Sequence, residues 1–271
     1  MDFTVPEMSD ILARIASVRS KDGDQEQSIA EWRSHYRNEL VSNRQQSPIE
    51  IFNRFVNALL ERATRSEPYR FRVQKFRDAF RSYDHVTETA VQDVFVALKN
   101  EGHGYRWGAK AGTDVVMEAR RVVMEPGFTW ERYVHQAEEQ YQDDFREDKF
   151  RTIRGVGYKT RDLALSELSD RFVAIDLHVV RVTSRIGLLL YGYGDDRLTT
   201  AVSQESGYLF FHGLILKMAR RTGWPDAAGY SPGEIDRMLW HFGRTLCSDT
   251  PKCRDCPIAD ICLTTVSLRP R

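Results

Sequence analysis

The sequence predicts an all-α protein, and three observations support that fold class. Apolar residues recur at helical spacing through most of the 271 residues. Turn signals rich in glycine and proline, EGHG at 101–104 and EPG at 125–127, separate the periodic segments. The apolar run at 172–175 suggests a strand, but it is too isolated to build a sheet.

The first two helices are predicted at 8–19 and 24–43 from their apolar faces. The clearest start signal follows, because Ser47 can cap a helix, Pro48 suits its first position, and Glu50 completes a capping box. The apolar stripe from 51 to 60 predicts that this helix faces the core. Further helices are expected at 68–82, 88–100, 108–123, 128–141 and 146–151.

Composition and charge limit the classes of function. Hydrophobic residues make up 41% of the chain, yet no run approaches the ~20 apolar residues that span a membrane. The N-terminal MDFTVPEMSD is acidic and polar, unlike a secretory signal, so we expect a cytoplasmic protein without a membrane partner. Basic and acidic residues balance at 39 each. Residues 62–81 are locally basic and 138–148 locally acidic, which fits either a local binding patch or two solvated helix faces.

All four cysteines, Cys247, Cys253, Cys256 and Cys262, lie within sixteen residues of each other. A secreted disulfide protein would normally scatter its cysteines along the chain to close long loops. Clustering of this kind in a reducing compartment predicts a metal site. Four thiolates in one compact loop can bind a [4Fe–4S] cluster or zinc, and the residues alone leave both possible.

A glycine turn stands between two helical stretches in RTIRGVGYKTRDLALSEL, residues 151–168. Gly155 and Gly157 permit a tight reversal, after which the next helix presents unpaired N–H groups that suit a phosphate. This is the pattern of a helix-hairpin-helix that grips a DNA backbone without reading bases. It also fits an ordinary helix connection with glycine at its C-cap. Lys159 follows the glycines, and Asp176 stands seventeen residues later, at the expected start of another helix.

Taken together, IRGVGYKTR at 153–161 and AIDLHVVRV at 174–182 resemble the paired motifs of the helix-hairpin-helix superfamily of DNA glycosylases. The subfamily they resemble is that of endonuclease III. WHFGRTLC at 240–247 is similar to the lead-in to that family's iron–sulfur loop, and SPIE at 47–50 is similar to the start of its first barrel helix. The resemblance covers about residues 47–262.

The resemblance implies two helical domains with a DNA-binding cleft between them. A helical barrel domain would span 47–168, with the helix-hairpin-helix at about 146–168. A cluster domain would combine 1–46 with 169–271 and carry a [4Fe–4S] loop at 247–262. The resemblance therefore favours the iron–sulfur cluster over zinc.

The resemblance assigns the chemistry to Lys159 and Asp176. The lysine amine would attack C1′ of an extruded nucleotide and form a Schiff base, while the carboxylate stabilises the positive charge that develops on the sugar. Strand cleavage by β-elimination can follow. Each residue also has a simpler interpretation, since Lys159 can be a plain phosphate contact and Asp176 a helix N-cap. Tyr158 and His178, beside these two residues, are expected to line the pocket.

The aromatic–basic turn GYRWG at 104–108 lies where relatives insert a wedge into the duplex. Arg106 or Trp107 is the expected wedge, and Arg62 is expected to fill the gap left by the extruded base. A loop with a packed tryptophan is the alternative. The other expected DNA contacts are Arg154, Gly155, Gly157 and Thr160 in the hairpin and Lys252 and Arg254 in the cysteine loop.

The sequence departs from the family pattern at several positions. Arg154 replaces a proline in the hairpin, Leu177 replaces a threonine after the aspartate, and Arg62 replaces a glutamine. The first gap between cysteines is one residue short, and the segment 183–246 is long. These departures leave the identity of the excised base open.

The sequence thus predicts a base excision repair DNA glycosylase with AP lyase activity, hydrolase and lyase in one. It is expected to be a monomer that acts on double-stranded DNA containing a damaged, mismatched or modified base, in the cytoplasm at the nucleoid. An oxidised pyrimidine is the default base by resemblance. The alternatives are a monofunctional glycosylase that uses water on a mismatched or enzymatically modified base, and a non-catalytic iron–sulfur DNA-binding protein.

Overall fold

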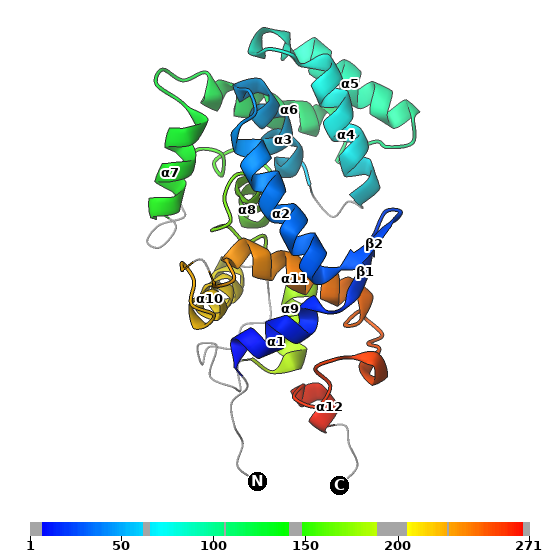
Figure 1. Ribbon diagram of the computed structural model, residues 1–271. Helices are drawn as coiled ribbons and strands as arrows, with labels where there is room; N and C mark the ends of the chain where they lie inside the picture. The colour runs from blue at the N-terminus through cyan, green and yellow to red at the C-terminus, as the bar shows by residue number, and fades with distance from the viewer. Residues whose placement is uncertain are drawn as a thin grey trace. The chain divides into compact units, whose positions relative to one another are not determined.

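The computed structural model describes residues 7–61, 66–105, 107–140, 148–188, 205–226 and 228–267. Within these residues there are twelve α-helices and one two-stranded sheet (Figure 1). The chain forms two compact units: a discontinuous unit, residues 1–39 with 170–271, and a continuous unit, residues 40–169. The domain boundaries expected at 46/47 and 168/169 stay a prediction. None of the described helices combines the length and apolar character needed to cross a bilayer.

The continuous unit consists of helices that follow one another along the chain. The predicted start of its helix α3 is confirmed, because the Glu50 carboxylate accepts hydrogen bonds from the Ser47 N–H at 3.0 Å and the Ser47 hydroxyl at 2.7 Å. Helix α2, Ile29–Arg44, crosses the boundary between the units. The other helices are α3 Pro48–Leu59, α4 Ser66–Ala79, α5 Glu88–Asn100, α6 Ala109–Val123, α7 Trp130–Gln140 and α8 Tyr158–Ser166, with a 3-10 helix η1 at Tyr83–His85.

Aromatic side chains fill the core of the continuous unit. The Phe55 ring lies 4.7 Å from the Phe150 ring and 5.0 Å from the Trp130 ring, centroid to centroid. Phe150, on the turn that leads to α8, is fully buried. Burial of aromatic side chains of this size is a large favourable contribution to folding. The segment preceding α8 is therefore anchored against α3 and α7 rather than lying on the surface.

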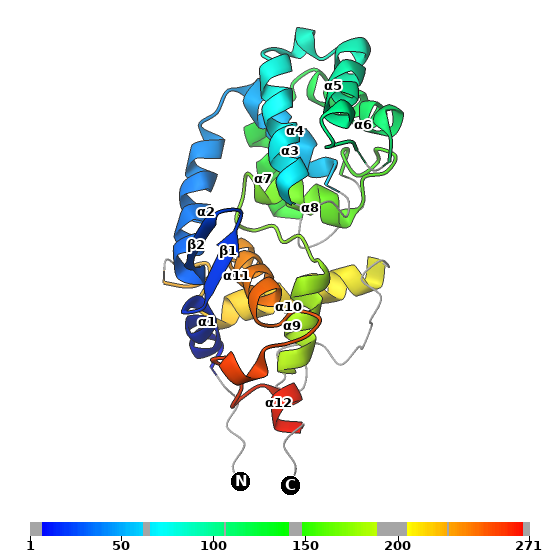
Figure 2. The same cartoon turned by 90° about the vertical axis from the view of Figure 1, so that its right-hand side faces the viewer.

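The discontinuous unit joins the two ends of the chain. Its helix α11 packs on α9, and both views show these two helices side by side (Figure 1; Figure 2). Gly243 permits this approach, because a Cβ there would lie 3.0 Å from the Cβ of His178. The unit contains α1 Met8–Ala16, β1 Arg19–Asp22, β2 Gln25–Ser28, α9 Leu177–Ile186, α10 Glu205–Arg221, α11 Pro232–Thr245, the 3-10 helix η3 Cys253–Asp255 and α12 Leu263–Ser267.

The prediction of helix from residue 24 was wrong, because a small two-stranded sheet precedes α2, while the rest of the fold is mostly helical as expected. Strands β1 and β2 pair antiparallel, with Asp22 opposite Gln25 across a two-residue loop that contains Gly23 at φ 61°. The two loop positions are Gly23 and Asp24, and glycine followed by aspartate is a signal for such a hairpin. Helix α2 begins only after Ser28, whose hydroxyl accepts a hydrogen bond from the Glu31 N–H at 3.2 Å. The local capping signal therefore sets the start of the helix.

The helix predicted at 146–151 is also wrong over its described residues, 148–151. This stretch forms a turn. The Asp148 carboxylate accepts hydrogen bonds from the backbone N–H of Phe150 at 2.8 Å and of Arg151 at 3.3 Å. An aspartate that bonds its own downstream backbone in this way competes with helix formation. The apolar run at 172–175, expected to be too isolated to build a sheet, forms no strand.

Candidate functional site

The glycine turn before α8 has the backbone that its sequence predicts. Gly155 has φ 95°, a left-handed conformation that side chains with a Cβ rarely adopt. Val156 is buried, and its N–H donates to the Ile153 carbonyl at 2.9 Å. Gly157 caps α8, and a Cβ on it would meet no atom within 4 Å. The turn is therefore held on its inner side and open at Gly157.

Lys159 lies in the first turn of α8 and is half-buried. Within the described residues, its ammonium has no hydrogen bond or ion pair, and no acceptor bonds its backbone N–H. Arg154, on the same turn, is exposed and also lacks a partner in the described part of the chain. Two unpaired cations beside the positive end of a helix dipole make this surface a suitable anion site.

Thr160 and Tyr158 support the turn. The Thr160 hydroxyl, predicted to contact DNA, is buried and accepts a hydrogen bond from the Gly157 N–H at 3.1 Å. Its side chain therefore holds the hairpin together, and a DNA contact by it stays a prediction. The Tyr158 ring is half-buried under the Arg151 guanidinium, 3.9 Å from the ring centroid. Its predicted place in a base pocket also stays a prediction.

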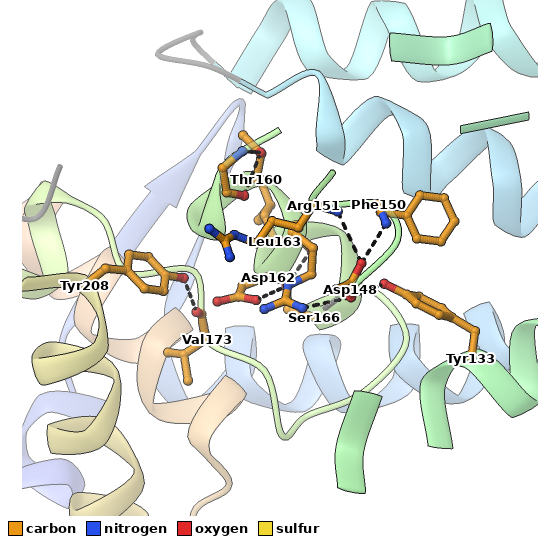
Figure 3. A network of polar contacts seen from close by, with 12 residues as sticks. Tyr133, Asp148, Phe150, Arg151, Thr160, Asp162, Leu163, Ser166, Val173 and Tyr208 are labelled. Carbon is orange, nitrogen blue, oxygen red and sulfur yellow. Dashed lines mark hydrogen bonds and ion pairs between the residues drawn. The ribbon is translucent and has the colours of Figure 1, made fainter. Parts of the chain in front are cut away.

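A buried polar network lies beneath the hairpin (Figure 3). Arg161, whose side chain is only 3% exposed, donates to Asp148 Oδ2 at 2.8 Å and to Asp162 Oδ1 at 2.6 Å. The Tyr133 hydroxyl donates to the same Asp148 oxygen at 2.8 Å. No sequence pattern predicts this network, because arginine and aspartate are ordinarily surface residues.

Charge and burial together set the protonation states of this network. Burial alone lowers the pKa of the Arg161 guanidinium, but Asp162 and Asp148 outweigh that effect and raise its pKa above the ordinary value. Burial, followed by the charge of Asp148, raises the pKa of Tyr133 well above its ordinary value. Arg161 therefore stays charged and Tyr133 stays neutral across the physiological pH range.

Asp176 is the N-cap of α9. Its Oδ1 accepts hydrogen bonds from the backbone N–H of His178 at 2.8 Å and of Val179 at 3.0 Å. Its Oδ2 has no partner within the described residues. The next residue, Leu177, is 71% exposed. One carboxylate oxygen thus holds the helix, and the other is available to a ligand. Lys159 belongs to the continuous unit and Asp176 to the discontinuous one.

His178 packs against α11 and pairs with a neighbour on its own helix. Its ring stands edge-on to Trp240 at 6.4 Å, and its Nδ1 is 3.4 Å from the Arg181 Nη1. These contacts account for a packing role. A role in the pocket remains a prediction.

The four cysteines line one small pocket together with apolar side chains that include Ile186 and Phe242. Arg185, from α9, donates to the Ser248 carbonyl at 2.5 Å and lies 3.8 Å from the Cys247 sulfur. Its own carbonyl accepts a hydrogen bond from the Cys262 thiol at 3.3 Å. Burial raises the pKa of the Cys247 thiol, as it does that of Cys256. The cysteine loop is therefore tied to the end of α9 opposite Asp176.

The remaining predicted contacts fall into three groups. Lys252 and Arg254 are exposed and have no partner within the described residues. Trp107 is 52% exposed. Arg62 and Arg106 lie outside the described residues. In the basic segment 62–81, Arg72 is buried and bonds the Glu61 carboxylate at 2.7 Å, so that arginine belongs to the core rather than to a binding face.

Comparison with known proteins extends these observations. The sequence matches no protein-family model, and no curated protein matches it. The structure is similar to the crystal structure of an 8-oxoguanine DNA glycosylase from Methanocaldococcus jannaschii, with a TM-score of 0.55 and 18% sequence identity. The match covers 88% of this chain and 94% of that chain. The mostly helical fold of this protein, with its small two-stranded sheet, is thus one that a DNA glycosylase also adopts.

Proposed function

We propose that this protein is a DNA glycosylase of base excision repair with AP lyase activity. The observation that carries the proposal is the unpaired ammonium of Lys159 in the first turn of α8, directly after a glycine turn with an open side. A lysine without a carboxylate partner is free to attack an electrophilic carbon. The fold shared with a DNA glycosylase supports the same function.

The proposed reaction uses two residues. As the bond from C1′ to the base nitrogen breaks, positive charge builds on the sugar, and the free Oδ2 of Asp176 stabilises it. The uncharged amine of Lys159 then bonds to C1′, and the base leaves with a proton. Opening of the sugar ring gives a Schiff base, whose acidified C2′ loses a proton, so that the 3′-phosphate departs by β-elimination. The base must leave the helical stack before this chemistry can begin.

Trapping with borohydride tests this proposal. Duplexes that carry a preformed abasic site, an oxidised pyrimidine, 8-oxoguanine or an enzymatically modified base are incubated with the protein and the reductant. We expect a covalent adduct that disappears in Lys159→Gln and persists in the control Lys99→Gln, which removes an exposed lysine of the same unit. Excision without an adduct would indicate the monofunctional alternative. Duplex binding without excision or adduct would indicate the non-catalytic one.

The substrate class follows from the same proposal. We propose double-stranded DNA with a damaged, mismatched or modified base as the partner, bound by a monomer at the nucleoid in the cytoplasm. An oxidised pyrimidine is the first candidate base. The named substrate of the similar structure, 8-oxoguanine, makes an oxidised purine the second. The panel of duplexes above decides between them.

We further propose that Cys247, Cys253, Cys256 and Cys262 hold a [4Fe–4S] cluster that stabilises the loop 247–262, between α11 and α12. Four thiols around one apolar pocket fit the donor set of such a cluster. The preference for the cluster over zinc rests on the resemblance of the cysteine loop to the iron–sulfur loop of endonuclease III-like glycosylases.

Purification under anaerobic conditions tests the cofactor. We expect a brown protein that absorbs near roughly 400 nm and contains about four iron atoms for each chain. A protein that contains zinc instead of iron and has no visible absorption would refute the cluster. The proposal for Lys159 would be unaffected by that result.

A further inference from the structure

Arg161 holds the first turn of α8 to the turn that precedes it. Its guanidinium bonds Asp148 on one side and Asp162 on the other. The second oxygen of Asp148 accepts the N–H groups of Phe150 and Arg151. One buried cation thus connects the start of α8 to the turn at 148–151, and the Tyr133 hydroxyl fixes the same aspartate from α7.

The position of Arg161 relative to Lys159 gives this connection a function. The two residues are two positions apart in a helix, where each residue turns about 100°. Their side chains therefore point to nearly opposite sides, so Arg161 is buried while Lys159 faces outward, half-exposed. A shift of the buried side chain changes the direction of the outward one, because a single helical turn carries both.

We propose that Arg161 is a positioning residue for the Schiff-base reaction. Through its paired contacts with Asp148 and Asp162, Arg161 fixes the location and direction of the Lys159 side chain. This inference rests on the proposed function. The planar fork of an arginine can bond two carboxylates at fixed angles, whereas a lysine ammonium is a point charge on a flexible stem. A buried ion pair is often no more stabilising than an apolar replacement, so its use here lies in geometry rather than in stability.

The test measures chemistry separately from binding and from folding. A duplex with a preformed abasic site removes any dependence on the identity of the base. The rate constant for adduct formation with borohydride is measured with protein in excess, and affinity is measured on a duplex with a reduced abasic analogue. Thermal melting of each variant reports stability.

Arg161→Lys keeps the charge and loses the fork. We expect its adduct rate to fall about 10- to 100-fold, since a misplacement of the attacking amine by about 1 Å costs on the order of 100-fold in rate. The Kd for the abasic analogue should stay within roughly threefold of the wild-type value. Tyr133→Phe removes one hydrogen bond to Asp148 and nothing else, so we expect a smaller loss. This variant keeps the proposal testable where Arg161→Lys does not fold.

The matched control is Arg54→Met. Arg54 forms a half-buried ion pair with Glu167 at 3.2 Å, at the opposite end of α8. We expect a similar loss of thermal stability with an unchanged adduct rate. An adduct rate for Arg161→Lys equal to that of this control would overturn the positioning role alone. A wild-type protein that forms no adduct would overturn the proposed lyase function, and the positioning role with it.

Discussion

Replacing Asp176 by asparagine separates its two roles at the start of α9. In the structure, Oδ1 accepts both capping hydrogen bonds, at 2.8 and 3.0 Å, and Oδ2 has no partner within the described residues. Asparagine can present its carbonyl oxygen to the same two N–H groups but carries no charge. The variant Asp176→Ala loses both the cap and the charge.

The expected free energies of unfolding follow from these contacts. Asp176→Asn should lose only the attraction between the carboxylate and the helix dipole, about 0.3–1 kcal/mol. Asp176→Ala should lose a further ~1 kcal/mol for the cap. Excision, by contrast, should fall by about 10²–10³-fold in both variants, because both lack the charge that stabilises the sugar in the transition state.

Urea denaturation followed by circular dichroism measures the stabilities, and single-turnover excision at one fixed salt concentration measures the chemistry. An Asp176→Asn variant that excises at the wild-type rate would refute the electrostatic role. If Asp176→Asn is as unstable as Asp176→Ala, the assignment of the cap to Oδ1 alone is refuted.

Three other predictions concern stability and binding. Gly112→Ala should destabilise α6, because a Cβ there would lie 2.4 Å from the ring of buried Phe95. The cost of overpacking, about 1–3 kcal/mol, exceeds the ~1 kcal/mol gained from helix propensity. In urea denaturation, the control Gly213→Ala, at an open position, should show only the gain in stability. Burial lowers the pKa of His241 to about 4, so the native state resists a proton that the unfolded state accepts near pH 6.5. Stability should be full above that pH and fall by up to about 3 kcal/mol toward pH 4, at about 1.36 kcal/mol per pKa unit, and a shallower pH profile is expected for His241→Asn. Arg154→Ala should weaken duplex binding and reduce the slope of log K against log salt by about 1; an unchanged slope would exclude a phosphate contact.

Helix starts could be predicted from the sequence where the signal is local. Ser47 and Glu50 bond each other across one turn, and the structure contains that bond. The helix expected at 88–100 is present as α5, Glu88–Asn100, and Thr87 caps it through a hydrogen bond from the Ala90 N–H. The strands β1 and β2 could not be predicted from apolar alternation, because their residues are almost all polar. Ser20 is buried there against residues far along the chain, because its hydroxyl lies 3.0 Å from His241 Nδ1 and accepts a hydrogen bond from the Thr245 hydroxyl at 3.0 Å.

The candidate site divides in the same way. The turn at Gly155 and the cap at Asp176 depend on neighbours in sequence and could be predicted. The burial of Arg161 depends on Asp148, thirteen residues earlier, whose carboxylate also forms the turn that replaced a predicted helix. No pattern of charges indicates which arginine is surrounded by carboxylates and which faces water.

The discontinuous unit has a consequence for how the protein is made. Its first 39 residues leave the ribosome before the 130 residues of the continuous unit, and their packing partners in α10 and α11 come later still. At about 5–20 residues per second, this delay lasts roughly 7–26 seconds. During that time the apolar face of α1, formed by Met8, Ile11, Leu12 and Ile15, has no partner helix to cover it. The continuous unit can fold as it emerges, so the nascent chain holds one folded unit and one that is still unfolded. The unfolded unit is the natural client for a chaperone at the ribosome exit.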